Sequence, residues 1–268
     1  MKVSDVYKIA DELAPKRLSD EYCARYGAYD NSGVLVDTGD EIKGVLFTLD
    51  LSFAAIDRAV EIGANLIVCH HPAIYAKISD LRIDDERLTG SKIVKCIKAG
   101  ISVIAMHLNV DTVDGGIDEC LMQGVALAAG ESAPKICAQM HPVDGGSYGK
   151  AYDLPAISVQ GLAENMKKVF STDRILVYGG EKTVCRAASC CGAGADEEGI
   201  LFAKNAGADV FISSDFKHHL LTLAMENGMG VIVLTHYASE NYGFEKYCKK
   251  ICQRLDIPCV YHTESSWL

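Results

Sequence analysis

The chain has 268 residues, of which 49% are hydrophobic and 23% are charged, as in an ordinary globular protein. Its formal net charge of −10 argues against a nucleic-acid polymer as the main partner, because phosphate contacts need a basic surface. No apolar run approaches the roughly 20 residues that a membrane-spanning helix needs. A small anionic substrate is compatible with this charge if bound metal ions supply the positive charge.

The N-terminal segment and the cysteines both indicate a cytoplasmic protein. Apolar residues at Val3, Val6 and Ile9 predict an amphipathic helix that ends before Pro15. The charges within this segment leave no uncharged signal core. The eleven cysteines are odd in number and form no CxxC pair. In a reducing compartment such cysteines behave as small buried apolar residues, and a disulfide framework is not expected.

One pattern occurs four times along the chain: a helix-like segment, a glycine, an apolar run and then a polar residue. The four copies cover residues 54–72, 91–111, 201–219 and 220–240. The glycine suits the left-handed position that ends a helix. The apolar runs are short, nearly continuous and rich in β-branched residues, as in strands that are buried on both faces. Helices alternating with such strands predict an α/β fold.

The four copies fall into two pairs, which predicts two similar α/β lobes over residues 1–130 and 131–268. A looser segment of about residues 131–185 separates the pairs, and its glycines and prolines suggest a connection. The runs 44–50 and 174–180 are expected to add one strand to each lobe. The last helix can alternatively pack back onto the first lobe.

Ligand-type side chains follow all four apolar runs. They are His70 and His71 in the first copy, His107 and Asp111 in the second, Asp215, His218 and His219 in the third, and His236 and Glu240 in the fourth. Ligands of open α/β sheets bind outside the carboxyl ends of the strands. Because these residue types recur at corresponding places, the sequence predicts a metal site at the strand ends.

The first two motifs leave alternatives open. His70 and His71 can be an ordinary strand end, but Pro72 biases the chain toward an extended conformation, so that each imidazole can serve a different ion. In "HLNVD" the residues His107, Asn109 and Asp111 share one side if the segment is extended. Asp111 is either a metal ligand or an Asx-turn residue. The spacing excludes an EF-hand loop.

The motif "THYASE" gives the most specific spacing. If a helix starts near Thr235, His236 and Glu240 lie one turn apart on one face. Together with His70, His71 and Asp111 they make five nitrogen and oxygen ligands, without a cysteine. Such a set suits two divalent ions, roughly 3.5–4 Å apart and bridged by a carboxylate and a water.

Two further segments are interpreted as structural. The turn "CCGAGADEEG", residues 190–199, opens a helix with acidic residues, which favours a capping turn over a phosphate site. The basic cluster of Lys246, Lys249, Lys250 and Arg254 has helical spacing and is most simply a solvated helix face. A contact face for a partner is the alternative.

Four separated motifs give the chain a resemblance to a known family. "NLIVCHHPAIY", "HLNVD" followed by "GG", "SDFKHH" and "THYASE" resemble the NGG-interacting-factor-three family of dinuclear-metal-centre proteins, which are also described as type two GTP cyclohydrolase homologues. The resemblance extends over essentially the whole chain, in the short form without an inserted domain. It implies two similar α/β lobes, a two-metal site in the cleft between them and a ring-shaped homohexamer.

The resemblance also assigns residues. It carries the metal ligands onto the same five residues that the spacing selects, with Glu240 as the bridging carboxylate. The positions that it places along the cleft are His107, Asp215, Lys217 and His219. The chain departs from the family pattern at three positions: Leu108 for the usual Thr, Ser214 for Gly and Tyr152 for Gly. None of these is a ligand, but each can alter the pocket.

Two kinds of function follow. The first is a metal-dependent hydrolase that uses His107 or His219 as a proton shuttle, with Asp215 orienting one of them. By resemblance its substrate is a purine nucleotide such as GTP. The second is a regulatory or ligand-binding protein whose metals scaffold a partner without turnover. A metal-buffering protein is disfavoured because five ligands leave open coordination positions. The ligands accept Zn, Mn, Fe, Co or Ni.

Overall fold

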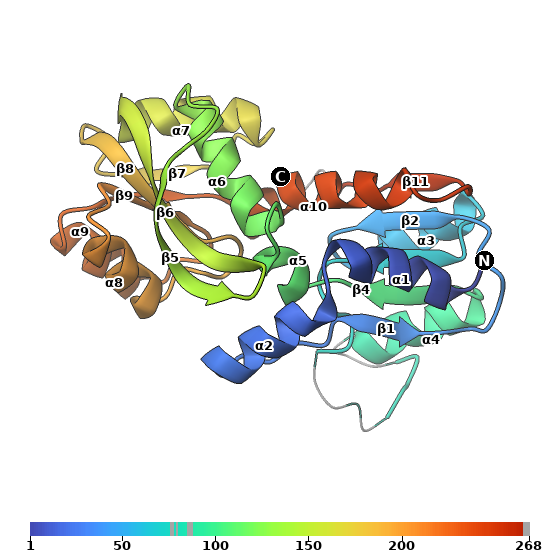
Figure 1. Ribbon diagram of the computed structural model, residues 1–268. Helices are drawn as coiled ribbons and strands as arrows, with labels where there is room; N and C mark the ends of the chain where they lie inside the picture. Colours follow the sequence, from blue (N-terminus) through green and yellow to red (C-terminus); the bar gives the residue numbers. More distant parts are fainter. Residues whose placement is uncertain (76–77, 79, 85–87, 265–268) are drawn as a thin grey trace. The chain divides into compact units, whose positions relative to one another are not determined.

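The computed structural model describes residues 1–75, 78, 80–84 and 88–264, and these fold into two compact units (Figure 1). Unit 1 comprises Met1–Val110 and Phe244–Thr263, and unit 2 comprises Asp111–Gly243 and Glu264. The division falls within α5 (Leu108–Thr112) and α10 (His236–Cys252), so each of these helices contributes residues to both units.

The sheet of unit 1 has five strands among the described residues, in the order β1-β4-β3-β2-β11. The strands are β1 (Gly33–Val36), β2 (Val45–Thr48), β3 (Leu66–Cys69), β4 (Ser102–Ala105) and β11 (Cys259–Tyr261). All neighbours are parallel except β1, which is antiparallel to β4. The register aligns Thr48 with Cys69 and Cys69 with Ala105. The segments that follow these residues therefore leave the sheet at one edge.

The helices of unit 1 are α1 (Val3–Leu13), α2 (Lys16–Tyr26), α3 (Phe53–Glu61) and α4 (Thr89–Lys98). The amphipathic N-terminal helix is confirmed, since Val3 and Val6 are buried and the helix ends before Pro15. Apolar residues of α3 and α4, among them Ile56 and Ile93, pack on the sheet core around Ile67. Gly63 and Gly100 adopt the left-handed conformation after α3 and α4, as the repeated pattern predicts.

The part of unit 2 that the structure describes contains a six-stranded sheet, in the order β5-β6-β8-β9-β10-β7. The strands are β5 (Ile136–Val143), β6 (Gly146–Ser158), β7 (Leu176–Tyr178), β8 (Thr183–Ser189), β9 (Val210–Ser213) and β10 (Gly230–Val233). β8, β9 and β10 are parallel, and the outer pairings are antiparallel. Ser189 aligns with Ile212, and Ser213 aligns with Val233. The segments after these three strands therefore share one edge of the sheet.

The helices of unit 2 are α6 (Ile117–Ala128), α7 (Val159–Val169), α8 (Glu197–Asn205) and α9 (His218–Glu226). Ile200 of α8 and Leu220 of α9 share a core with Phe211 and Val231 of the sheet. The Asp196 carboxylate caps α8 by accepting a hydrogen bond from Gly199 N at 2.7 Å. The capping interpretation of this turn is therefore correct.

The two units differ from the expected lobes in three places. Helix α6 belongs to unit 2, because it packs on α7 and β6. The C-terminal segment belongs to unit 1, as the alternative for the last helix allowed, because β11 pairs with β2 and Tyr247 Oη donates to Ala10 O at 2.8 Å. The segment expected to be a loose connection instead forms the long β5–β6 hairpin. The α/β class is confirmed.

In the described part of the chain, no helix is both long and apolar enough to cross a membrane.

Candidate metal centre

Three imidazoles gather where β3 and β4 of unit 1 end. The ligand-type nitrogens of His70, His71 and His107 lie within 4.8 Å of one another. The ring centroid of His70 is 4.8 Å from that of His71 and 5.1 Å from that of His107. The His70 side chain is buried, whereas those of His71 and His107 are partly exposed. The aligned register of the two strands brings these residues together from separate motifs.

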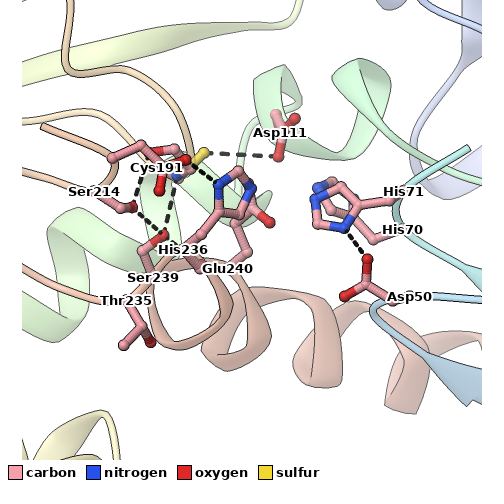
Figure 2. Close-up of polar contacts among 12 residues, drawn as sticks. Asp50, His70, His71, Asp111, Cys191, Ser214, Thr235, His236, Ser239 and Glu240 are labelled. Atoms are coloured by element: carbon pink, nitrogen blue, oxygen red, sulfur yellow. Dashed lines mark hydrogen bonds and ion pairs between the residues drawn. The ribbon is translucent and has the colours of Figure 1, made fainter. Parts of the chain in front are cut away.

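Oxygen acceptors fix the orientation of the first two rings. His70 Nδ1 donates to Met106 O at 2.8 Å. His71 Nδ1 donates to Asp50 Oδ1 at 2.8 Å, as Figure 2 shows. A carbonyl and a carboxylate can only accept, so Nδ1 carries the proton in each ring. The lone pair of the neutral imidazole is then on Nε2, where a metal can bind it. Both side chains are therefore prepared as ligands.

His107 is oriented in the same way by Asp30. His107 Nδ1 donates to Asp30 Oδ1 at 2.9 Å, while Ser32 Oγ donates to Asp30 Oδ2 at 2.6 Å and Ser19 Oγ donates to the same oxygen. Burial by itself raises the pKa of Asp30, but the hydrogen bond from His107, its charge and the two serine bonds outweigh burial and hold that pKa below its usual range. Asp30 therefore stays ionised and keeps its acceptor role.

Unit 2 supplies an imidazole and a carboxylate from the start of α10. His236 Nε2 is 3.0 Å from Glu240 Oε1, as expected for residues one turn apart on one face. His236 Nδ1 is 2.6 Å from Asp215 Oδ2. Two donors that are each about 2.0–2.2 Å from one ion lie about 3 Å apart when the angle between them is near 90°. The Nε2–Oε1 spacing thus fits neighbouring ligands of one metal ion.

The second carboxylate of unit 2 is Asp111, which is 3% exposed. It lies in the short helix α5, so the extended arrangement considered for "HLNVD" is wrong. Asn109 instead donates to Ala14 O at 2.7 Å inside unit 1. Cys191 Sγ donates to Asp111 Oδ1 at 3.6 Å. Burial first, and then the charge of Asp111, raises the pKa of the Cys191 thiol well above its usual value, so it remains a donor.

Gly192, in the turn after β8, packs directly against the two candidate metal ligands of α10, His236 and Glu240. Gly192 has a φ of +54°, and a Cβ at this position would lie 2.1 Å from Glu240 Oε1 and 3.2 Å from His236 Nε2. Gly192 N donates to Ser239 Oγ at 3.0 Å, and Ser214 Oγ donates to Gly192 O at 2.8 Å (Figure 2). Both the backbone conformation and the available space therefore require glycine.

A buried ion pair holds this turn from the other side. Asp118 Oδ1 accepts from Cys191 N at 3.1 Å, and Asp118 Oδ2 accepts from Gly149 N at 3.0 Å and from Lys150 Nζ at 2.9 Å. The side chains of Asp118 and Lys150 are 0% and 2% exposed. The carboxylate thus connects α6 and β6 to the segment after β8.

The other predicted site residues are less central. Asp215 has a φ of +57° and is exposed, and its contact is with His236 rather than with His107 or His219. His219 and Lys217 are exposed at the start of α9. Among the described residues, the groupings of possible metal ligands do not include His219.

Two of the positions where the chain departs from the family pattern have a visible role. Ser214 holds the backbone of Gly192. Tyr152 is fully buried in unit 2, with its hydroxyl 3.2 Å from Ser189 Oγ. Both substitutions therefore support the packing of unit 2.

Sequence reasoning missed Asp30, Asp50, Asp118 and Gly192. Asp50 and Gly192 follow strands at the same edges as the predicted ligands, and that placement could have identified them. Asp30 precedes β1 in an irregular segment, and Asp118 lies inside an ordinary helix. Neither residue carries a local signal.

Comparisons with known proteins identify the family and the fold of this chain. Residues 1–265 match the model of the family described as Duf34/NIF3 (NGG1p interacting factor 3). A Clostridium perfringens protein named "GTP cyclohydrolase 1 type 2 homolog" is 30% identical over 260 residues, which cover 96% of this chain and 93% of that protein. "NGG1-interacting factor 3" of Saccharomyces cerevisiae is 27% identical over 250 residues, covering 84% of each chain. The crystal structure of a hypothetical Staphylococcus aureus protein has the same fold, with a TM-score of 0.80, 23% identity and coverage of 98% of this chain and 96% of that one. The resemblance seen in the motifs is confirmed, and the chain belongs to the Duf34/NIF3 family.

Proposed function

We propose that the protein is a hydrolase that uses two divalent metal ions. Their ligands would be His70 and His71 from unit 1 and Asp111, His236 and Glu240 from unit 2. One observation carries the proposal: the Nδ1 atom of each of these three imidazoles faces an oxygen acceptor, which directs Nε2 toward metal binding. Each unit alone offers too few donors for a dinuclear centre, so the proposal requires donors from both.

In this proposal the residues of the chain would orient the metal ligands and transfer a proton. When bound, the ions would polarise the scissile bond and lower the pKa of a shared water toward neutrality. Asp50 and Asp215 hold two ligand imidazoles in position. His107, with Nδ1 held by Asp30, presents Nε2 as the proton-transfer atom. We assign the shuttle to His107 rather than to His219, which lies exposed in α9.

A purine nucleotide such as GTP is the proposed substrate class. The support is the name of the Clostridium perfringens relative, "GTP cyclohydrolase 1 type 2 homolog", and the family resemblance. The net charge of −10 means that an anionic substrate would depend on the ions for its attraction. Zn, Mn, Fe, Co and Ni all suit the ligand set.

Elemental analysis and turnover test this proposal together. Protein purified without chelators or added metals is expected to hold about two ions per chain. Turnover of a nucleotide panel should depend on these ions and fall more than about 100-fold in Glu240→Ala. Glu245→Ala is the matched control, because Glu245 lies on the same helix in an exposed pair with Lys249. Unchanged turnover in Glu240→Ala would contradict the proposal.

A metal-containing regulatory or scaffolding protein is the second candidate. Its support is the name of the yeast relative, "NGG1-interacting factor 3". Absence of turnover with every nucleotide, together with partner binding that survives metal loading, would favour it. The basic cluster of residues 246–254 gives it little support, because Lys249 of α10 pairs with Glu245, and Arg254, which follows α10, pairs with Glu12.

We also propose a cytoplasmic homohexamer. The hexameric ring comes from the family resemblance, and the cytoplasmic location from the eleven cysteines, all of which are thiols. Light scattering checks the assembly, since six chains of 28.9 kDa give a particle of about 170 kDa. A monomeric or dimeric mass would contradict the ring.

A further inference from the structure

Two exposed tyrosines of unit 1 form a pair beside the imidazole cluster. Tyr29 is 54% exposed and Tyr75 is 52% exposed. Their ring centroids are 5.5 Å apart at an interplanar angle of 81°. Tyrosine combines an apolar ring with a polar hydroxyl and is enriched at binding interfaces, so an exposed pair of tyrosines is a candidate binding surface.

The tyrosine pair is held in place relative to His107. Tyr75 Oη donates to Tyr29 O at 3.3 Å, and Asn31 Nδ2 donates to Ile74 O at 2.6 Å, so two segments distant in sequence are tied together. The Tyr75 ring centroid is 6.0 Å from that of His107. Residue 30, between Tyr29 and Asn31, is the Asp that accepts from His107. The segment that presents Tyr29 therefore also orients His107.

We propose that Tyr75 provides the stacking face of a subsite for the planar heterocycle of the substrate, and that Tyr29, whose ring stands at 81° to that of Tyr75, holds it in place. The inference rests on the proposed function and specifies how the purine is recognised. Every nucleobase has a π-face, so stacking on aromatic side chains selects for a planar ring without reading its hydrogen-bonding edge. A purine stacked on Tyr75 would lie beside His107, the residue assigned to proton transfer. The subsite would thus hold the purine ring next to His107, the residue that transfers the proton.

Charge supports a ring rather than a phosphate at this subsite. Asp30 adjoins Tyr29 in sequence and is ionised, and its pairing with His107 leaves little net positive charge there to attract a phosphate group. An uncharged purine ring does not need such a charge. The phosphates of the nucleotide would then interact with the metal ions, and Tyr75 with the base.

Calorimetric titration of the metal-loaded protein with GTP and with inorganic triphosphate tests the subsite. Native protein should bind GTP at least about tenfold more tightly than triphosphate, because stacking on one aromatic ring typically contributes that much. Tyr75→Ala should weaken GTP binding about tenfold, and Tyr29→Ala, which removes only the contact that holds Tyr75, should weaken it less. Both variants should leave triphosphate binding within about twofold. Tyr75→Phe retains the ring and should stay within about threefold of native protein for both ligands.

Three outcomes would overturn the subsite. These are equal binding of GTP and triphosphate by native protein, equal losses for both ligands in Tyr75→Ala, and an altered oligomeric mass in Tyr75→Ala with GTP binding unchanged. The last would show that the pair contacts another chain. Failure of the proposed hydrolase is a separate result: absence of turnover with the GTP preference intact and lost in Tyr75→Ala refutes the reaction but supports the subsite.

Discussion

The two units position their metal-binding side chains in different ways. In unit 1 the donors are imidazoles, and each is oriented by one hydrogen bond to an acceptor on another segment, as with His71 and Asp50. In unit 2 the donors are packed: Gly192 lies against Glu240 and His236 with no room for a Cβ, and Cys191 contacts Asp111. His236 of unit 2 is also oriented, by Asp215, but close packing is added only in unit 2. The ligands of unit 1 thus depend on hydrogen-bond direction alone, and those of unit 2 depend in addition on tight packing.

This difference predicts different responses to substitution. A hydrogen-bond acceptor can be weakened stepwise, so changes around the imidazoles of unit 1 should lower metal affinity by degrees. At the glycine turn of unit 2 there is no room for even one added methyl group. A substitution there should therefore abolish metal binding by His236 and Glu240 instead of weakening it by degrees. Four substitutions test the comparison.

The largest effect on stability is expected from Asp118→Asn in unit 2. The change leaves Lys150 charged, buried and without its carboxylate partner, which typically costs about 3–5 kcal/mol. Asp153→Asn is the matched control, since its pair with Arg186 is solvent-exposed and screened by water, so its loss should change stability little. Denaturant unfolding measures both. Equal losses in the two variants would show that the buried pair is not the support of unit 2.

Gly192→Ala should prevent His236 and Glu240 of α10 from binding metal. The added methyl group would meet Glu240 Oε1, and the left-handed backbone adds about 1 kcal/mol of strain. Gly228→Ala separates these causes, because Gly228 has a similar φ of +83° and open space among the described residues. Backbone strain should cost both variants about 1 kcal/mol of unfolding free energy. Only Gly192→Ala adds the clash with Glu240, so only this variant should lose metal by elemental analysis. Full metal content in Gly192→Ala would disprove the packing argument.

Asp50→Asn tests the directional mechanism of unit 1. An Asn side chain can still accept a hydrogen bond but carries no charge, so His71 is held less firmly. The expected loss of metal affinity is about 10- to 100-fold, with the fold intact. Competition with a chelator of known affinity measures it. Asp57→Asn is the control, because Asp57 is a surface carboxylate paired with Lys95. An all-or-none loss in Asp50→Asn would remove the distinction between the units.

Sequence reasoning succeeded where a local pattern decides the structure. The strands and their glycine-ended helices follow from burial and backbone preference, and the i and i+4 spacing placed His236 beside Glu240. It failed where distant segments determine the result. The conformation of "HLNVD" depends on the hydrogen bond from Asn109 to the carbonyl of Ala14. The β5–β6 hairpin depends on strand pairing that its glycine-rich sequence does not indicate. Asp30 reaches His107 only after folding, across 77 positions of sequence.

The smallest expected effect is on how the unfolding free energy depends on acidic pH, to which Asp30 of unit 1 contributes. Its pKa is lower in the folded chain than the value of about 3.9 in an unfolded chain, so folding favours the carboxylate. This stabilisation is complete well above the unfolded pKa and is lost as pH falls through the folded pKa. Unfolding free energies measured from pH 6 down to about 3 should therefore fall less steeply in Asp30→Asn than in native protein. Parallel slopes would mean that His107 and the two serines do not stabilise the charge of Asp30, and unit 1 would then lack its directional support at this histidine.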